Sequence, residues 1–301
     1  MNEYLDYSKF HNRLCLTGSL VLETGLSIGA GSEDSVIGAD ISVVRDAWGK
    51  PFVPGSSFKG ILRAEVERLA RTIAPHATKD DNDQPLLWAC ANPLDMQEGL
   101  CVKVSCKEEL AKEARRGDGL MDESEFAKSI AKKSCPVCRL FGSPWLAGKI
   151  RVRDMPVDER TWVGRIEVRD GVGIRRDTRT AAKNVLYSYE VVPAGTRFDC
   201  QILIENADEL ELGLAMLGLR ELQQGRLLLG GASSRGLGRV KLEPWETITW
   251  VNGANSDGLL DYLATGKGKT LGQDDLDEYI KNLVNLLRSK GEVSENVSKG
   301  A

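Results

Sequence analysis

The sequence predicts an α+β fold, because two amphipathic helices are separated by segments with the character of short strands. The first helix is expected from residue 55 to about residue 72, where apolar side chains recur at helical spacing. The second is expected between residues 206 and 225, where leucines follow the same spacing and a glycine ends the pattern. Strands are expected at residues 13–23 and at two places between residues 184 and 204.

The overall composition is that of a globular protein. Charged residues make up 28% of the 301 residues and hydrophobic residues 42%. Because no long apolar run is present, we expect neither a signal peptide nor a membrane span, and we expect a cytoplasmic location. The net charge of -4 means that any nucleic acid must be bound by local basic clusters rather than by the whole surface.

Residues 36–63 have the pattern that is most indicative of function. An extended run and a turn precede Pro54, and the predicted helix then begins at a Gly-Ser-Ser sequence in which either serine can act as the N-cap. Free backbone N–H groups, hydroxyls and basic side chains at a helix start can hold a phosphate. The side chains expected to do so are Ser56, Ser57, Lys59 and Arg63. The alternative is an ordinary capped helix.

Residues 76–148 form a predicted insertion that contains most of the seven cysteines. An odd number of cysteines without a secretion signal favours reduced thiols or metal ligands over disulfides. Cys135 and Cys138 form a C-x-x-C knuckle, which with two further cysteines can complete a tetrahedral zinc site. We prefer Cys90 and Cys101 as the second pair, with Cys106 as the competitor. Four thiolates leave no open position, so the zinc would be structural; buried free thiols are the alternative.

A basic segment follows the knuckle. Residues 149–183 contain ten basic and six acidic residues, a local net charge of +4. After a short predicted strand at 149–154, residues 169–183 lack the periodicity of a core element, and are better suited to lie along a polyanion than to pack. The residues expected to contact such a polyanion are Arg169, Arg175, Arg176, Arg179 and Lys183. A solvated loop of mixed charge is the alternative.

A glycine-rich loop at residues 230–239 lies between a short apolar strand at 227–229 and a strand from Val240. Its glycines allow close approach of a phosphodiester, although their spacing is not that of a dinucleotide fingerprint. The residues expected to contact the phosphodiester are Gly231, Ser233, Ser234, Arg235 and Gly236.

The C-terminal extension, residues 251–301, is acidic and contains one predicted helix at 276–287. Residues 266–270 resemble the end of a P-loop. Leu263 stands where that motif requires a glycine, so nucleotide hydrolysis is not expected.

Five of these segments together resemble the RAMP superfamily, and in particular the backbone subunits of type III CRISPR effector complexes. The segments are 37–46, 54–60, 135–142, 170–195 and 230–238. The cysteine-bearing insertion resembles that of the zinc-containing members in subtype D- and E-like complexes. The resemblance covers residues 12–245, most of the chain.

The resemblance implies a ferredoxin-like (RRM-like) core within residues 1–250, with a thumb β-hairpin at about 160–195 and the zinc-binding insertion. In this family, subunits stack along a CRISPR RNA, and the thumbs interrupt the guide–target duplex at regular intervals. The implied partners are therefore CRISPR RNA, target RNA and other subunits of the effector complex. An aspartate in the loop before the Gly-Ser-Ser helix cuts target RNA with a divalent metal ion such as Mg²⁺.

The aspartate that matches this position is Asp40, six residues before Asp46, with Asp34 and Glu33 as alternatives. RNA carries its own nucleophile, the 2′-hydroxyl, so one carboxylate that holds Mg²⁺ or acts as a base is sufficient. That chemistry suits a chain with only two histidines. A scaffold that binds guide RNA without cleaving target RNA is the main alternative, and a guide-processing ribonuclease is a more remote one.

Overall fold

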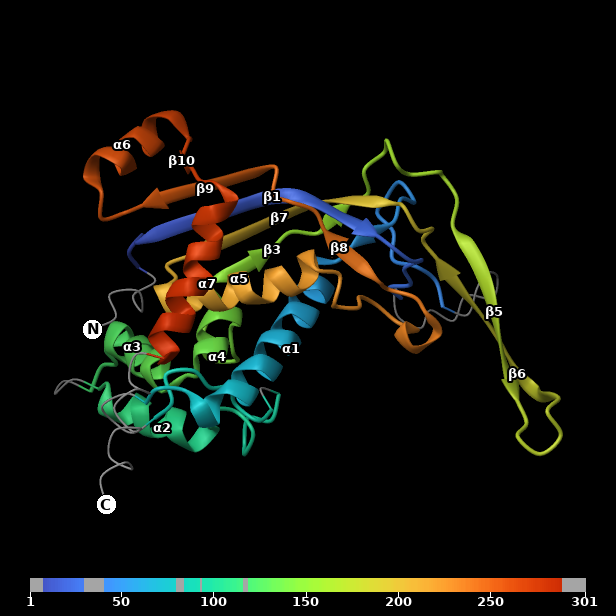
Figure 1. The fold of residues 1–301 in the computed structure, drawn as a ribbon. Helices are drawn as coiled ribbons and strands as arrows, with labels where there is room; N and C mark the ends of the chain where they lie inside the picture. The colour runs from blue at the N-terminus through green and yellow to red at the C-terminus, as the bar shows by residue number, and fades with distance from the viewer. Residues whose placement is uncertain (1–7, 30–40, 80–83, 93, 116–118, 289–301) are drawn as a thin grey trace, which may run out of the picture.

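The computed structural model describes residues 8–29, 41–79, 84–92, 94–115 and 119–288 (Figure 1). It has an antiparallel six-stranded sheet, with helices packed on one face and a separate two-stranded hairpin that extends away from the sheet. The predicted α+β class is confirmed. No helix among these residues is long and apolar enough to cross a membrane.

The sheet is built around its first strand, β1 (Asn12–Leu22). On one side β1 pairs with β7 (Arg197–Glu205), which in turn pairs with β3 (Ile150–Val152). Leucines at alternate positions of β1, such as Leu14 and Leu16, are fully buried beneath the helices. The apolar pattern therefore fixes which face of β1 is packed.

The opposite edge of β1 is shared by two short strands. β8 (Val240–Leu242) pairs with the C-terminal end of β1, and β9 (Thr247–Asn252) pairs with its N-terminal part. β10 (Lys269–Thr270) then extends the sheet beyond β9. Only β8 was expected from the sequence.

Two helices complete the core. α1 (Gly55–Ile73) follows β1, and α5 (Glu209–Gln223) follows β7. With strand order β9-β1-β7-β3, this connectivity is that of a ferredoxin-like fold, as predicted. Gly218 of α5 lies against Leu62 of α1, so a side chain there would collide with the other helix. Asp208 caps α5 in a reciprocal capping box with its N3 glutamate.

The N-terminus of α1 differs from the prediction. The expected cap at Ser56 or Ser57 is wrong, because the helix begins at Gly55 and Pro54 takes the N-cap position. The backbone N–H of Gly55 instead donates to the carboxylate of Asp154, 2.8 Å away, from the segment between β3 and β4. A distant aspartate thus takes the place of a local hydroxyl.

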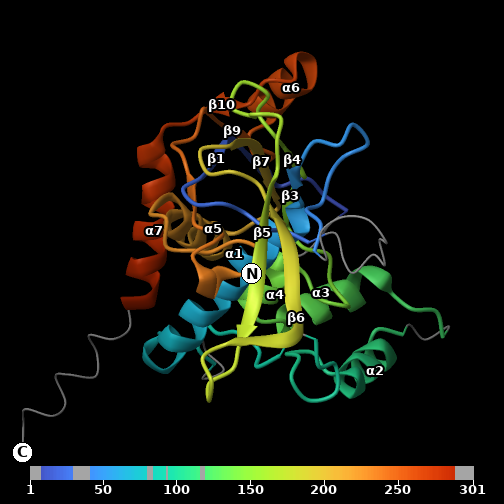
Figure 2. The same ribbon diagram turned by 90° about the vertical axis from the view of Figure 1, so that its right-hand side faces the viewer.

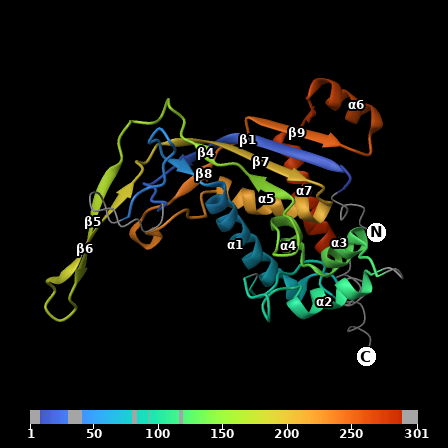
Figure 3. The ribbon, with the colours of Figure 1, turned by 180° about the vertical axis from the view of Figure 1, so that it is seen from behind.

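The insertion between α1 and β3 packs at the end of α1 remote from the sheet (Figure 3). The helical stretch predicted at 108–133 is in fact two helices, because Asp122 starts a new helix by accepting from the backbone N–H of Glu125. The helical elements of the insertion are η2 (Ala74–His76), α2 (Val104–Glu113), α3 (Glu123–Lys133) and α4 (Pro136–Phe141).

A long hairpin formed by β5 (Glu167–Ile174) and β6 (Ala181–Val191) projects from the other end of the sheet (Figures 1 and 2). Its base is close to a small pair formed by β2 (Phe52–Val53) and β4 (Met155–Pro156). The lack of a core period that the sequence showed over residues 169–183 agrees with their place in the outer part of this hairpin. Side chains of β5 are exposed along most of its length, so no buried face imposes a period of two.

The C-terminal extension adds two helices. α6 (Ser256–Thr265) lies beside β9 and β10. α7 (Gln273–Arg288) packs across α5, where Gly213 allows close approach of Leu283. α7 corresponds to the single helix that the sequence predicted, whereas α6 was missed.

Candidate metal centre and nucleic-acid interface

The structure brings four cysteines together: Cys90, Cys101, Cys135 and Cys138. Their sulfur atoms all lie within 4.8 Å of one another, and the Sγ atoms of Cys90 and Cys138 are 3.6 Å apart. Four sulfurs arranged tetrahedrally at about 2.3 Å from a metal ion are about 3.8 Å apart. The cluster therefore has the size and the donor set of a tetrahedral thiolate site.

Local structure aims the C-x-x-C pair at one point. Cys135 is the N-cap of α4, and its sulfur accepts from the backbone N–H of Cys138 at 3.4 Å. Pro136 at the first helical position favours this start, and Gly142, at φ +97°, ends the short helix. Cys106, the competing ligand, packs with a separate apolar cluster around Val102 instead.

The four thiols cannot all ionise in the absence of a cation. A hydrogen bond from Cys135, reinforced by one from Cys138, lowers the pKa of Cys101. The same contacts with Cys101 raise the pKa of Cys135 and of Cys138. A bound dication would offset the repulsion between adjacent thiolates, so this donor set fits a metal ion.

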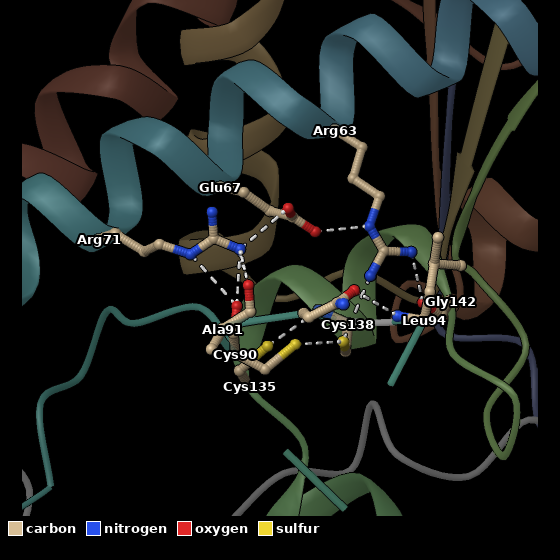
Figure 4. A network of polar contacts seen from close by, with 10 residues as sticks. Arg63, Glu67, Arg71, Cys90, Ala91, Leu94, Cys135, Cys138 and Gly142 are labelled. Carbon is tan, nitrogen blue, oxygen red and sulfur yellow. Dashed lines mark hydrogen bonds and ion pairs between the residues drawn. The ribbon is translucent and has the colours of Figure 1, made fainter. Parts of the chain in front are cut away.

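Figure 4 shows that α1 contacts this cluster through two arginines, which a glutamate of the same helix links. Arg63 donates to the sulfur of Cys138 at 3.4 Å and to the carbonyl of Gly142 at 2.9 Å. Arg71 donates to the carbonyl of Cys90 at 2.6 Å. Glu67 forms ion pairs with both arginines, at 2.7 Å and 3.1 Å.

The basic side chains expected to hold a phosphate at the start of α1 have internal partners. Lys59 donates from Nζ to the carbonyl of Ile150 at 2.9 Å, and burial lowers its pKa. Arg63 points into the insertion, as described above. Ser56 is exposed and Ser57 is half-buried. The helical periodicity placed Lys59 and Arg63 on the side of α1 away from its core face, but it could not show that the insertion covers that side.

The hairpin, in contrast, presents its basic residues to solvent. Arg175, Arg176 and Arg179 are exposed at its tip, and Arg169 pairs with Glu167 at 2.9 Å. The side chain of Lys183 lies outside the described residues.

Apolar side chains are exposed along the same two strands, and our sequence reasoning did not single them out. They are Val168, Val172, Ile174 and Leu186, each at least 49% exposed. The sequence could have indicated them, because aliphatic residues occur there in a segment that lacks the periodicity of a core element.

The glycine-rich loop lies against the base of the hairpin. Ser233, Ser234 and Arg235 are exposed, and the guanidinium of Arg235 is 5.1 Å from the ring centroid of Tyr187 in β6. Gly238, at φ +83°, is so close to the carbonyl of Leu229 that no side chain would fit. Gly231 and Gly236 are exposed with this loop. The predicted strand at 227–229 is reduced to an isolated bridge at Leu228.

The segment that leads into α1 also pairs with the base of the hairpin. Ile41 donates to the carbonyl of Ser188 and accepts from Glu190, at 3.2 Å and 2.9 Å. Arg45 forms an ion pair with Glu190 at 2.5 Å. Asp46 accepts from the backbone N–H groups of two residues in the turn that follows. The candidate catalytic residues Asp40, Asp34 and Glu33 lie outside the described residues.

Comparison with known proteins shows the family to which the chain belongs. The model of the RAMP superfamily matches residues 19–241. The chain belongs to the RAMP superfamily. The match confirms the resemblance to RAMP subunits of type III CRISPR systems that the sequence predicted.

Two relatives match most of this RAMP chain. One is the CRISPR system Cms endoribonuclease Csm3 of Methanocaldococcus jannaschii, 27% identical over 78% of this chain and 81% of the relative. The protein of the same name from Methanothermobacter thermautotrophicus is 26% identical over 78% of this chain and 85% of the relative. A shorter match, 49% identical over 55 residues, joins 18% of this chain to 23% of the Csm3 of Mycobacterium tuberculosis.

Within this RAMP chain, the segments of the predicted pattern meet in two places. The hairpin, the glycine-rich loop and residues 41–46 meet at one end of the sheet. The C-x-x-C segment meets α1 and the loop around Cys90 within the insertion. The first place exposes cations and apolar groups, whereas the second encloses sulfur atoms.

Proposed function

We propose that this chain is a backbone subunit of a type III CRISPR effector complex, which binds guide RNA and cleaves target RNA beside it. Support comes from relatives named CRISPR system endoribonucleases, which match 78% of this chain. Further support comes from the surface at the base of the hairpin, where exposed arginines and serines flank the segment that follows Asp40.

In this proposal the hairpin is the thumb that separates guide–target base pairs into short runs. Its exposed aliphatic side chains can insert between bases, and the arginines at its tip can contact phosphates. Sequence would be read by base pairing, while the protein contacts the backbone and the shape of the duplex. The partners would be CRISPR RNA, target RNA and other subunits of the complex.

Asp40 is the proposed catalytic carboxylate. It immediately precedes Ile41, whose backbone is bonded to the base of the hairpin, and this pairing is the observation that carries the proposal. A Mg²⁺ ion at this carboxylate would stabilise charge that develops on the phosphate during attack by the 2′-hydroxyl. The protein's own contribution is to hold the target strand in line for that attack.

The test is the Asp40→Ala variant within the reconstituted complex. Target binding and assembly should be unchanged, while cleavage beside this subunit should disappear and cuts beside its neighbours should persist. Asp34→Ala and Glu33→Ala test the alternatives, and Asp46→Ala is the control that changes only the turn. If Asp40→Ala cuts its own site at the wild-type rate, Asp40 is not catalytic. If none of the carboxylate variants loses cleavage, the scaffold alternative gains support.

The cysteine cluster is proposed to hold one structural Zn²⁺. Thiolate-rich tetrahedral sites favour zinc, and four cysteines leave no position for water or substrate. Chelation of Mg²⁺ alone should abolish cleavage and leave this ion in place, which distinguishes the two metals.

A further inference from the structure

We propose that Arg63 of α1 is a positioning residue of the metal centre, so that the core helix, and not the insertion alone, determines how tightly the metal ion is held. The inference rests on the proposal that the cysteine cluster binds a metal ion. It assigns to Arg63 a role different from the phosphate contact that its sequence position suggests.

The orientation of Arg63 is fixed by three partners. Its Nη2 donates to the Cys138 sulfur at 3.4 Å, its Nη1 to the Gly142 carbonyl at 2.9 Å, and its Nε to Glu67 at 2.7 Å. The side chain is only 22% exposed. A guanidinium held at three of its nitrogens has little freedom to reach an RNA phosphate, but is well placed to hold one ligand sulfur in a single orientation.

The same face of α1 also holds the segment that carries a second ligand, Cys90. Residues 63, 67 and 71 are successive i, i+4 positions, so their side chains lie on one side of the helix. Arg71 donates to the carbonyls of Cys90 and Ala91, and Glu67 links the two guanidinium groups. Cys90 and Cys138 are 48 positions apart in the sequence. α1 therefore fixes the relative position of two ligand segments that the chain itself connects only loosely.

Charge gives Arg63 a second role. Four thiolates and one dication carry a net charge of -2, and this charge is largely enclosed by protein, since three of the four cysteines are buried. A guanidinium N–H bonded to one sulfur partly offsets it and withdraws electron density from that sulfur. The sulfur then donates electron density less strongly to the metal ion, and this changes the energy of the charge-transfer absorption between sulfur and metal.

The experiment uses the full chain loaded with Co²⁺ in place of zinc, because Co²⁺ reports its thiolate ligands by charge-transfer absorption. The variants are Arg63→Met, which keeps the aliphatic volume, and Arg63→Lys, which keeps the charge but not the fork. Arg68→Met is the matched control, because Arg68 lies on the same helix and pairs with Glu65 rather than with the cluster. Release of Co²⁺ to a chelator and the position of the charge-transfer band are measured.

Arg63→Met should release metal about 10–100-fold faster, the usual effect of losing a group that orients a metal ligand. Its charge-transfer band should move to lower energy, because the sulfur of Cys138 becomes a stronger donor. Arg63→Lys should restore part of both effects, and Arg68→Met should match wild type. A purely packing role would change release without moving the band.

Three results would overturn the inference. If Arg63→Met loads Co²⁺ with wild-type release rate and spectrum, the bond from Arg63 to Cys138 has no role at the metal. If Arg63→Met does not fold, Arg63→Lys carries the test, since it removes the guanidinium fork; a wild-type band and release rate in that variant would be equally adverse. If wild type binds neither Co²⁺ nor Zn²⁺, the proposed metal centre itself is wrong.

Discussion

Charged side chains around the cysteine cluster and on the hairpin are used in opposite ways. Around the cysteine cluster, the guanidinium of Arg63 is enclosed and bonded to protein atoms. On the hairpin, Arg175 and Arg176 are exposed in the turn between β5 and β6, and the hairpin projects away from the sheet (Figure 1). The same residue type therefore stabilises the fold in one place and remains available for a ligand in the other. Burial, more than charge count, distinguishes the two roles.

The largest effect is expected from substitution of the proposed metal ligands. Cys135→Ser or Cys138→Ser should lower the metal content from about one zinc per chain and unfold the insertion, because closed thiolate sites contribute directly to folding. Metal analysis and hydrogen exchange would measure both. Cys106→Ser is the control, since Cys106 packs with another cluster. A folded insertion in a metal-free chain would contradict the prediction. The hairpin, which lies at the other end of the sheet, should keep its exchange pattern.

The next effect concerns a buried charge network that joins the insertion to the core. Glu211 is 0% exposed and pairs with buried Lys149 at 2.6 Å and with Arg139 at 3.0 Å. Glu211→Ala should lower the free energy of unfolding by about 3–5 kcal/mol, because it leaves two enclosed cations without their shared partner. Denaturant unfolding measures the change.

The matched hairpin substitution is Glu167→Ala, which removes an exposed ion pair with Arg169. It should change the free energy of unfolding by no more than about 0.5 kcal/mol. Similar losses of stability in Glu211→Ala and Glu167→Ala would mean that ion pairs of the hairpin are as important for folding as those of the core, and would contradict the contrast between the two regions.

A smaller effect is expected on RNA binding. Arg235→Ala should weaken binding to unrelated RNA sequences about equally and reduce the slope of log affinity against log salt by about one, as loss of one phosphate contact does. Filter binding at several salt concentrations tests this. Arg226→Ala is the control, because Arg226 is exposed but pairs with Glu221. A loss restricted to one RNA sequence would instead indicate base recognition.

The smallest effect is expected on the free energy of unfolding when an exposed apolar side chain of the hairpin is replaced. Leu186 is 72% exposed, so Leu186→Ser should leave the free energy of unfolding within about 0.5 kcal/mol of wild type. Leu62, which is fully buried between α1 and α5, provides the contrast, and Leu62→Ala should cost about 2–5 kcal/mol. A large loss in Leu186→Ser would mean that the hairpin packs against the body of the protein.

Much of the core could be predicted because its elements have a buried face. β1 and α1 were predicted to within one residue of their observed ends, since leucines and other apolar residues mark the packed side of each. In the hairpin, the sequence pattern indicated a strand only from residue 184, because exposure on both faces of β5 removes that signal, and the hairpin as a whole was expected from the family resemblance. α6 was missed for a related reason, as it has no buried residue and hence no periodic core face.

The candidate site was predicted unevenly for the same physical reason. Ligand chemistry depends on residue type and local spacing, so the four cysteines that the structure brings together could be named from the sequence. Their role as zinc ligands stays a prediction, as do the RNA contacts and the part played by Asp40. The partners of Lys59 and Arg63 could not be found, because Ile150 and Cys138 lie more than seventy positions away along the chain.

The pairing of β1 has a consequence for synthesis on the ribosome. One edge of this N-terminal strand is completed only by β8 and β9, which lie between residues 240 and 252. A nascent chain must therefore hold an unpaired edge until most of its length has emerged from the exit tunnel. A message truncated before residue 240 would yield a product with that edge permanently open, a template for aggregation with other chains. The risk of aggregation during synthesis therefore lasts until β8 and β9 have paired with β1.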